Sequence, residues 1–115
     1  MSDYKDLEVW KRSIDLTKSI YTLTSSFPDT EKFGLTNQMR RSSVSIPSNI
    51  AEGSARSTNK DFAHFLSIAL GSACELETQV ILSKELNFSK DIDILLVEIT
   101  IIRKMINALK KSILK

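Results

Sequence analysis

The chain has 115 residues, of which 42% are hydrophobic and 26% charged, and its formal net charge is +2. This length suits one domain, residues 1–115, and the composition is that of a folded globular chain rather than a disordered one. So small a charge excludes the strong basic excess that alone would indicate a nucleic-acid-binding protein. The single cysteine, Cys74, excludes an internal disulfide and favours a reducing compartment, so we expect a cytoplasmic location.

Only three glycines and two prolines are available to build turns, so the structural elements should be long. Hydrophobic residues recur with helical periodicity in four segments, at about residues 5–26, 36–53, 59–86 and 90–113. Four helices with short connections predict an all-α fold, an antiparallel up-down-up-down four-helix bundle.

The first segment carries an apolar face whose residues recur at three- and four-residue steps. Its members are Leu7, Trp10, Ile14, Tyr21 and Phe27, with Ile20 and Leu23 beside them. Pro28 should end this helix, because the residue before a proline is pushed out of the α region.

The second segment contains a proline in its interior. Thr36 is expected to cap its start, and Gly53 is expected to end it. Pro47 removes one backbone hydrogen bond and crowds the carbonyl of Ser43. We predict a helix that is kinked near Pro47 but continuous. The alternative is a break, with Pro47 restarting a helix in its first turn.

No charged residue occurs from Ser42 to Ala51, around this proline. Serine and asparagine side chains such as Asn49 can bond backbone groups that Pro47 leaves free. The stretch is therefore interpreted as a structural joint that faces another helix or a subunit. Its expected contact residues are Ile46, Pro47, Asn49, Ile50, Glu52 and Gly53.

The third segment begins with Thr58 and Asp61, which resemble a capping box. A heptad seam follows at steps of four and three residues, formed by Phe62, Leu66, Ala69, Ala73, Leu76 and Val80. Other apolar residues lie off this seam, so we expect the helix to be buried on most sides. Gly71, beside Ser72 and Ala73, is expected to mark the close approach of another helix.

The fourth segment has Ser89 as its expected cap and a broad apolar face of leucine and isoleucine. Its lysine-rich end, within residues 101–115, also fits a membrane-surface helix. The apolar face continues the core stripe, however, which favours the bundle. The apolar run at 92–102 is interrupted by Asp93 and Glu98 and is too short to span a bilayer, so no membrane partner is expected.

Several motifs of the chain resemble one protein family. They are FP at 27–28, GL at 34–35, QMRRSSVSIPSNIAEGSAR at 38–56 and FAHFLSIALGSACELETQ at 62–79. They resemble the four-helix-bundle proteins encoded in intervening sequences of 23S ribosomal RNA genes, and the related accessory variability determinant protein of diversity-generating retroelements. The resemblance implies a pentameric ring without known enzymatic activity. In the retroelement branch it also implies binding to nucleic acid and to a reverse transcriptase. The small net charge of this chain favours the general branch.

The residues for catalysis or metal binding are sparse. A di-metal bundle needs Glu-x-x-His on two helices, whereas this chain has one histidine, His64, three residues after Asp61. No Gly-x-Ser-x-Gly elbow is present, and Cys74 has no neighbouring cation in sequence to activate it. We predict a non-enzymatic protein without a cofactor, a metal or a small-molecule substrate.

The basic residues leave two interpretations open. Arg40, Arg41, Arg56 and Lys60 are the candidate contacts to RNA or DNA. They fall into two groups near opposite ends of the second helix, and a ring of subunits could repeat each group around its axis. Alternatively, Arg40 or Arg41 pairs with an acidic residue at a subunit boundary. The candidate acids are Glu52, Glu75 and Glu77.

The sequence thus leads to two functional hypotheses. The first is a non-enzymatic homo-oligomer that acts as a binding or scaffold protein, because so many apolar faces need a cover. The second is a nucleic-acid-binding accessory protein.

Overall fold

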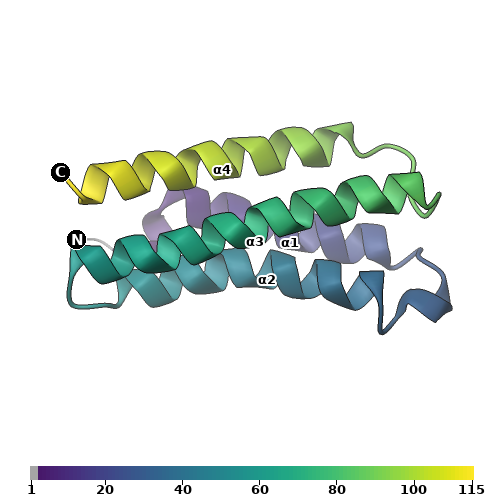
Figure 1. The fold of residues 1–115 in the computed structure, drawn as a ribbon, viewed down its shortest axis with the longest axis horizontal. Helices are drawn as coiled ribbons and strands as arrows, with labels where there is room; N and C mark the ends of the chain where they lie inside the picture. Colours follow the sequence, from purple (N-terminus) through teal and green to yellow (C-terminus); the bar gives the residue numbers. More distant parts are fainter. Residues whose placement is uncertain (1–2) are drawn as a thin grey trace.

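The computed structural model describes residues 3–115, which form four long helices and two short 3-10 turns. The helices are α1 (Glu8–Thr24), α2 (Leu35–Ser54), α3 (Asn59–Glu85) and α4 (Asp93–Ile113), with turns η1 (Tyr4–Asp6) and η2 (Asp29–Glu31). Successive helices run in opposite directions along a molecule 44 Å long, and α1 begins at the same end of the bundle at which α4 ends (Figure 1). The predicted antiparallel four-helix bundle is confirmed.

Helix α1 begins later than predicted, and its buried stripe matches the predicted face only in part. Ile20 and Phe27 of that face are buried, and Leu7, Trp10 and Leu23 pack against the core. Lys5 lies in η1, and its backbone N–H donates a hydrogen bond to the side chain of Asp3 at 2.9 Å. The buried residues of α1 are Val9, Ser13, Leu16, Ile20 and Thr24, whereas Tyr21 of the predicted face is 43% exposed. Ser13 and Thr24 can be buried because their hydroxyls donate to carbonyls of the same helix, at 2.8 Å each.

The start of α2 is capped by a residue that the sequence pattern did not indicate. The helix begins at Leu35, and its backbone N–H donates to Glu31 Oε1 at 3.1 Å. Thr36, the predicted cap, lies inside the helix and is buried. The carboxylate of Glu31 also complements the positive end of the α2 dipole.

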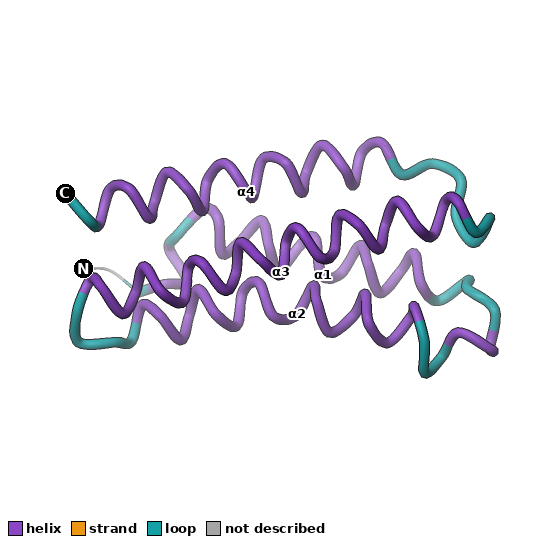
Figure 2. The backbone as a smooth tube through the Cα atoms, viewed as in Figure 1, coloured by secondary structure: helices purple, strands orange, loops and turns teal. Residues whose placement is uncertain are grey.

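Helix α2 continues through Pro47 without interruption as far as Ser54 (Figure 2). The continuous form of the two alternatives is therefore the one that occurs. Gly53, which was predicted to end the helix, lies within its last turn and is buried.

Helix α3 supplies the central seam of the bundle. Its heptad residues are all buried, from Phe62 with 6% exposure to five residues with none. Thr58 caps the helix, because its Oγ1 accepts from the Asp61 N–H at 3.1 Å. The heptad and the Thr58 cap are confirmed. Ile68 and Ile81 are 39% and 43% exposed, so the expectation of burial on most sides is wrong for the single chain.

Helix α3 is also long and apolar enough to cross a membrane by length and composition alone. Of that apolar stretch, 33% is buried inside the bundle. Core helices of soluble proteins meet the same two criteria, so this observation is weak evidence for a membrane span.

The end of α3 is fixed by a left-handed residue. Asn87 has φ 63°, and the backbone N–H of Phe88 donates to the Ser83 carbonyl at 2.8 Å. This is the Schellman arrangement, in which asparagine can take the place of the usual glycine. Ser89, the predicted cap of α4, is buried instead and shares a hydrogen bond with Ser83 at 2.7 Å between the two hydroxyl oxygens.

The four helices do not contact one another equally. Among helices that are neighbours in the bundle, α2 and α3 share the most extensive contact, and α1 and α4 share the least extensive one. The contact between α2 and α3 includes a hydrogen bond between two hydroxyl groups, those of Ser45 and Ser72, whose oxygens lie 2.8 Å apart. The loops lie only at the two ends of the bundle (Figure 2), so the long sides of the molecule are helix surface.

Candidate functional site

The Pro47 segment is built into the core of the chain itself. Ile46 and Ile50 have no exposed surface, and Pro47 is buried. The Ser43 carbonyl, which has no N–H at position 47 to bond, accepts from Thr17 Oγ1 of α1 at 3.1 Å. Asn49 Nδ2 donates to the Ser45 carbonyl at 2.8 Å. The group that compensates for Pro47 thus comes from α1, rather than from the neighbouring serines and Asn49.

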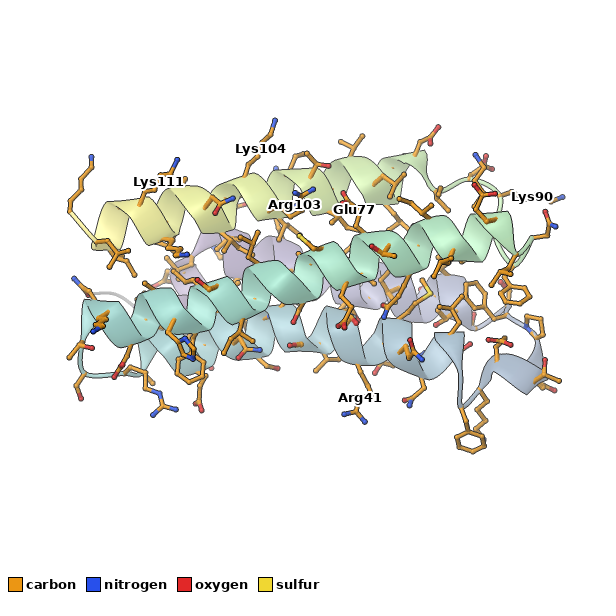
Figure 3. All side chains as sticks on the ribbon, viewed as in Figure 1. Arg41, Glu77, Lys90, Arg103, Lys104 and Lys111 are labelled. Carbon is orange, nitrogen blue, oxygen red and sulfur yellow. The ribbon has the colours of Figure 1, made fainter. Side chains whose placement is uncertain are left out.

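The two arginines near the start of α2 have different surroundings. Arg40 Nε donates to Thr24 Oγ1 at 2.9 Å, and its guanidinium carbon lies 4.5 Å from the centre of the Tyr21 ring. This stacked arrangement is a cation–π contact. Arg41 is exposed and extends from α2 into solvent (Figure 3). Within residues 3–115 it has no hydrogen-bond or ion-pair partner, which leaves it available to a ligand.

The second basic group lies at the other end of α2, as the sequence predicted. Arg56 pairs with Glu52 at 3.1 Å, and its guanidinium carbon lies 4.6 Å from the centre of the Phe65 ring. Lys60 is exposed in the first turn of α3. One chain therefore does not join the two groups into a single basic patch.

The acidic candidates have partners other than Arg40 and Arg41. Glu52 pairs with Arg56, and Glu77 accepts from Arg103 of α4 at 3.1 Å. Figure 3 shows Glu77 and Arg103 between α3 and α4. Glu75 accepts from Ser42 Oγ at 3.0 Å. The expected pairing of these acids with Arg40 or Arg41 does not occur within the described part of the chain.

The two helical glycines differ in what surrounds them. A Cβ built on Gly53 would lie 2.7 Å from Phe65 Cβ and 2.9 Å from Phe62 Cδ1. A Cβ on Gly71 would meet nothing within 4 Å. The close approach of a helix that was expected at Gly71 is therefore found at Gly53, at the junction of α2 and α3.

A polar groove lies between α2 and α3. It has a volume of about 400 Å³, and its lining residues are Gln38, Arg41, Ser42, Ser45, Glu75 and Gln79. Gln79 is only 7% exposed, and its Oε1 is buried without a hydrogen-bond partner. The sequence analysis named Arg41 and Glu75 as candidate residues but missed Gln79. This residue stands among the apolar seam residues Leu76 and Val80, so the pattern there indicated core packing and not a polar site. We call this feature the acceptor groove.

Large hydrophobic residues are exposed around the connection between α3 and α4. We call this set the apolar end. Its members are Ile81, Leu82, Leu86, Ile94 and Val97. Ile94 is 85% exposed and Val97 60% exposed, although both lie in a well-formed helix.

The described residues assemble no group for metal-dependent chemistry. Within residues 3–115, no three histidine, cysteine, aspartate or glutamate side chains are grouped so that they could hold a metal ion. His64 is exposed, and its ring lies 5.6 Å from that of Phe65, centre to centre. The polar side chains described above instead form contacts between helices and surfaces open to a partner.

Fold and surface define a small, all-helical bundle with a hydroxyl-bonded α2–α3 contact, an acceptor groove and an exposed apolar end. Over residues 5–108 the sequence matches the family described as 23S rRNA-intervening sequence protein, and the chain belongs to this family.

A solved structure supports this assignment. It is the crystal structure of a protein with unknown function from the S23 ribosomal protein family, from Bacteroides thetaiotaomicron. The two chains are 25% identical and superpose with a TM-score of 0.80, covering 90% of this chain and 98% of that one. Among curated proteins, none matches this sequence.

Proposed function

We propose that this protein is a non-enzymatic homo-oligomer that acts as a binding or scaffold protein in the cytoplasm, without a membrane partner. The observation that carries this proposal is the exposed apolar end. Ile94 and Val97 are three residues apart on α4, and half-buried Ile101 follows four residues later. This spacing makes a second apolar stripe, separate from the buried one of Ile99, Ile102 and Ile106.

A helix on the outside of a bundle normally presents polar residues to water. No helix in residues 3–115 covers the stripe that contains Ile94 and Val97, so a second molecule is the natural cover. The family resemblance carried by the central motifs supports a ring of five copies. It also supports the absence of catalytic activity.

Light scattering after size exclusion tests the proposal. We expect an oligomer at micromolar concentration, and a monomer would contradict the proposal. The double variant Ile94→Lys, Val97→Lys should release monomers that keep a helical circular dichroism spectrum. Asn107→Lys, an exposed substitution on the same helix, is the matched control and should leave the oligomer intact.

Binding to RNA or DNA is the second candidate function. Exposed Arg41 favours it, because this guanidinium has no partner within the described residues, whereas Arg56 is already paired with Glu52. This second candidate function includes a relationship to the retroelement accessory proteins and, with it, binding to a reverse transcriptase. Gel shifts at low salt should show binding that weakens steeply as salt increases, because phosphate contacts release counterions. Arg41→Gln should weaken binding more than Arg56→Gln.

A further inference from the structure

The outward face of α4 carries residues at steps of three and four positions that the bundle leaves exposed or half-buried. We call this set the α4 outer stripe. Its members are Ile94, Val97, Ile101, Lys104, Ala108 and Lys111. The first half of the stripe is apolar and the second half is mainly cationic. Figure 3 shows Lys104 and Lys111 extending from α4 away from the bundle.

Helix α3 has an outward face with the same spacing, opposite its buried heptad seam. We call this set the α3 outer stripe. Its members are Ile68, Gly71, Glu75, Thr78, Leu82 and Glu85, and all are exposed. Within residues 3–115, neither Glu75 nor Lys104 of the α4 outer stripe forms an ion pair. Each stripe thus offers an unpaired charge beside exposed apolar residues.

The two stripes lie on opposite sides of the bundle. Glu75 bonds Ser42 of α2, whereas Ile94 lines a groove together with Asp15 of α1. Because α1 contacts α2 and α4 but not α3, the α2–α3 side and the α1–α4 side face away from each other. A chain with two different surfaces on opposite sides can contact one copy on each side, in a heterologous interface.

We propose that the α4 outer stripe of one copy packs antiparallel against the α3 outer stripe of the next copy, with Lys104 paired to Glu75. This inference rests on the proposed oligomer and names the two surfaces that meet in it.

The register of this contact follows from the bundle itself. The ion pair of Glu77 with Arg103, at 3.1 Å, shows which positions of α3 and α4 lie at the same level along the molecule. Copies related by a rotation axis parallel to the helices keep these levels. To within one residue, the pairs at equal level are Val97 with Leu82, Lys104 with Glu75, and Ala108 with Gly71.

These pairs are complementary in chemistry. Val97 and Leu82 are 60% and 44% exposed, so apolar surface meets apolar surface. Opposite charges meet one turn further on, and then two small residues, which leave room between the helices. A shift of one turn in either direction would place Lys104 opposite Thr78 or Gly71 and would lose the ion pair.

A stripe does not match a second copy of itself. Two α4 outer stripes running in the same direction would oppose Lys104 to Lys104. Running in opposite directions at full overlap, they would set lysines against Ile94 and Val97. Two α3 outer stripes in the same direction would oppose Glu75 to Glu75. Like charges that face each other across an interface oppose binding, so the heterologous pairing is favoured.

A charge swap tests the pairing by light scattering after size exclusion. Lys104→Glu and Glu75→Lys should each raise the concentration at which the oligomer forms by at least about tenfold. The double variant should restore assembly to within about threefold of the original protein. Asn107→Glu, which adds a negative charge to α4 outside the stripe, is the control and should leave assembly unchanged. Circular dichroism shows whether each variant is folded.

Disulfide trapping gives a second test that does not alter charge. Chains with Ala108→Cys are co-expressed with chains with Gly71→Cys, both in a Cys74→Ser background. Helices packed about 8–10 Å apart bring facing Cα atoms within the range of a disulfide. Oxidation should give a linked dimer from the mixture and none from either chain alone. Asn107→Cys in place of Ala108→Cys should give at least about fivefold less dimer.

The outcomes separate this inference from the proposed function. A monomeric original protein overturns both. An oligomer that resists both charge reversals, or a folded double variant that fails to assemble, overturns the pairing and leaves the oligomer standing. Linked dimers formed by Ala108→Cys chains alone would also overturn it, because they would show α4 against α4.

Discussion

Thr17 of α1 donates a hydrogen bond to the carbonyl of Ser43 in α2, with 3.1 Å between the two oxygens. That carbonyl is the one that Pro47 leaves without its helical donor. The same hydroxyl lies 2.9 Å from the Ser13 carbonyl, and its single hydrogen serves both acceptors. An interior proline is thus tolerated in α2 because the neighbouring helix provides a donor.

Removing this donor should destabilise the bundle in a way that depends on the proline. Thr17→Val keeps the shape of the side chain and should lower the free energy of unfolding by about 1 kcal/mol, as for a typical hydrogen bond. In the Pro47→Ala background the cost should fall below about half of this, because the introduced alanine provides its own backbone N–H. Urea denaturation of the four proteins gives the coupling energy. Equal costs of Thr17→Val in both backgrounds would contradict this account.

The two helical glycines should respond to alanine in opposite directions. Gly53→Ala places a Cβ 2.7 Å from Phe65 Cβ and should cost about 1–3 kcal/mol, as overpacking does. Gly71→Ala meets no atom within 4 Å and should stabilise the chain by about 0.5–1 kcal/mol through helix propensity. Thermal and urea unfolding at matched protein concentration measure both. If Gly71→Ala destabilised the protein as much as Gly53→Ala, then Gly71 would be a close contact between copies.

Asn87 should tolerate glycine better than any β-branched residue. Its φ of 63° is left-handed, so Asn87→Gly should be neutral or stabilising, and Asn87→Val should cost about 1–2 kcal/mol. Asn107, exposed inside α4, is the matched site. There the same change to glycine should destabilise by a few tenths of a kcal/mol, because glycine is a poor helix former. Differential scanning calorimetry of the three variants gives the comparison, and a destabilising Asn87→Gly would argue against the Schellman ending.

The ion pair between α3 and α4 should contribute more than the pair of Glu52 with Arg56, which lies just beyond the end of α2. The side chains of Arg103 and Glu77 are 38% and 26% exposed, whereas those of Arg56 and Glu52 are 44% and 55% exposed. Solvent screens the second pair more strongly, so double-mutant cycles should give about 0.5–1 kcal/mol for the first pair and about 0.3 kcal/mol for the second. Both values should decrease as salt is added. The reverse order would indicate that register, rather than exposure, determines their strength.

The sequence predicted the features of the fold that depend on spacing within one helix. The α3 seam and the Thr58 cap are local patterns, and each can be read from residues three or four positions apart. The stripe of α1 was predicted only in part, because Ser13 and Thr24 count as polar, although their hydroxyls bond the carbonyls of their own helix.

Partners on different helices could not be read from the sequence. Glu75 bonds Ser42 and Glu77 bonds Arg103 because of the register between neighbouring helices. Spacing along one chain does not fix that register. For the same reason the acceptor groove was missed. The side chain of Gln79 projects from α3 towards α2. Its unpaired oxygen becomes apparent only when the positions of both helices are known.

The unequal contacts between helices also imply an order in which the bundle opens. Of the neighbouring helices, α1 and α4 have the least extensive contact, and a single ion pair, Arg12 to Glu98 at 3.2 Å, joins them among the described residues. Backbone amides of these two helices should therefore exchange with deuterium through partial openings. Those of α2 and α3 should require nearly complete unfolding. The central hairpin would then be the last part of the molecule to lose its structure.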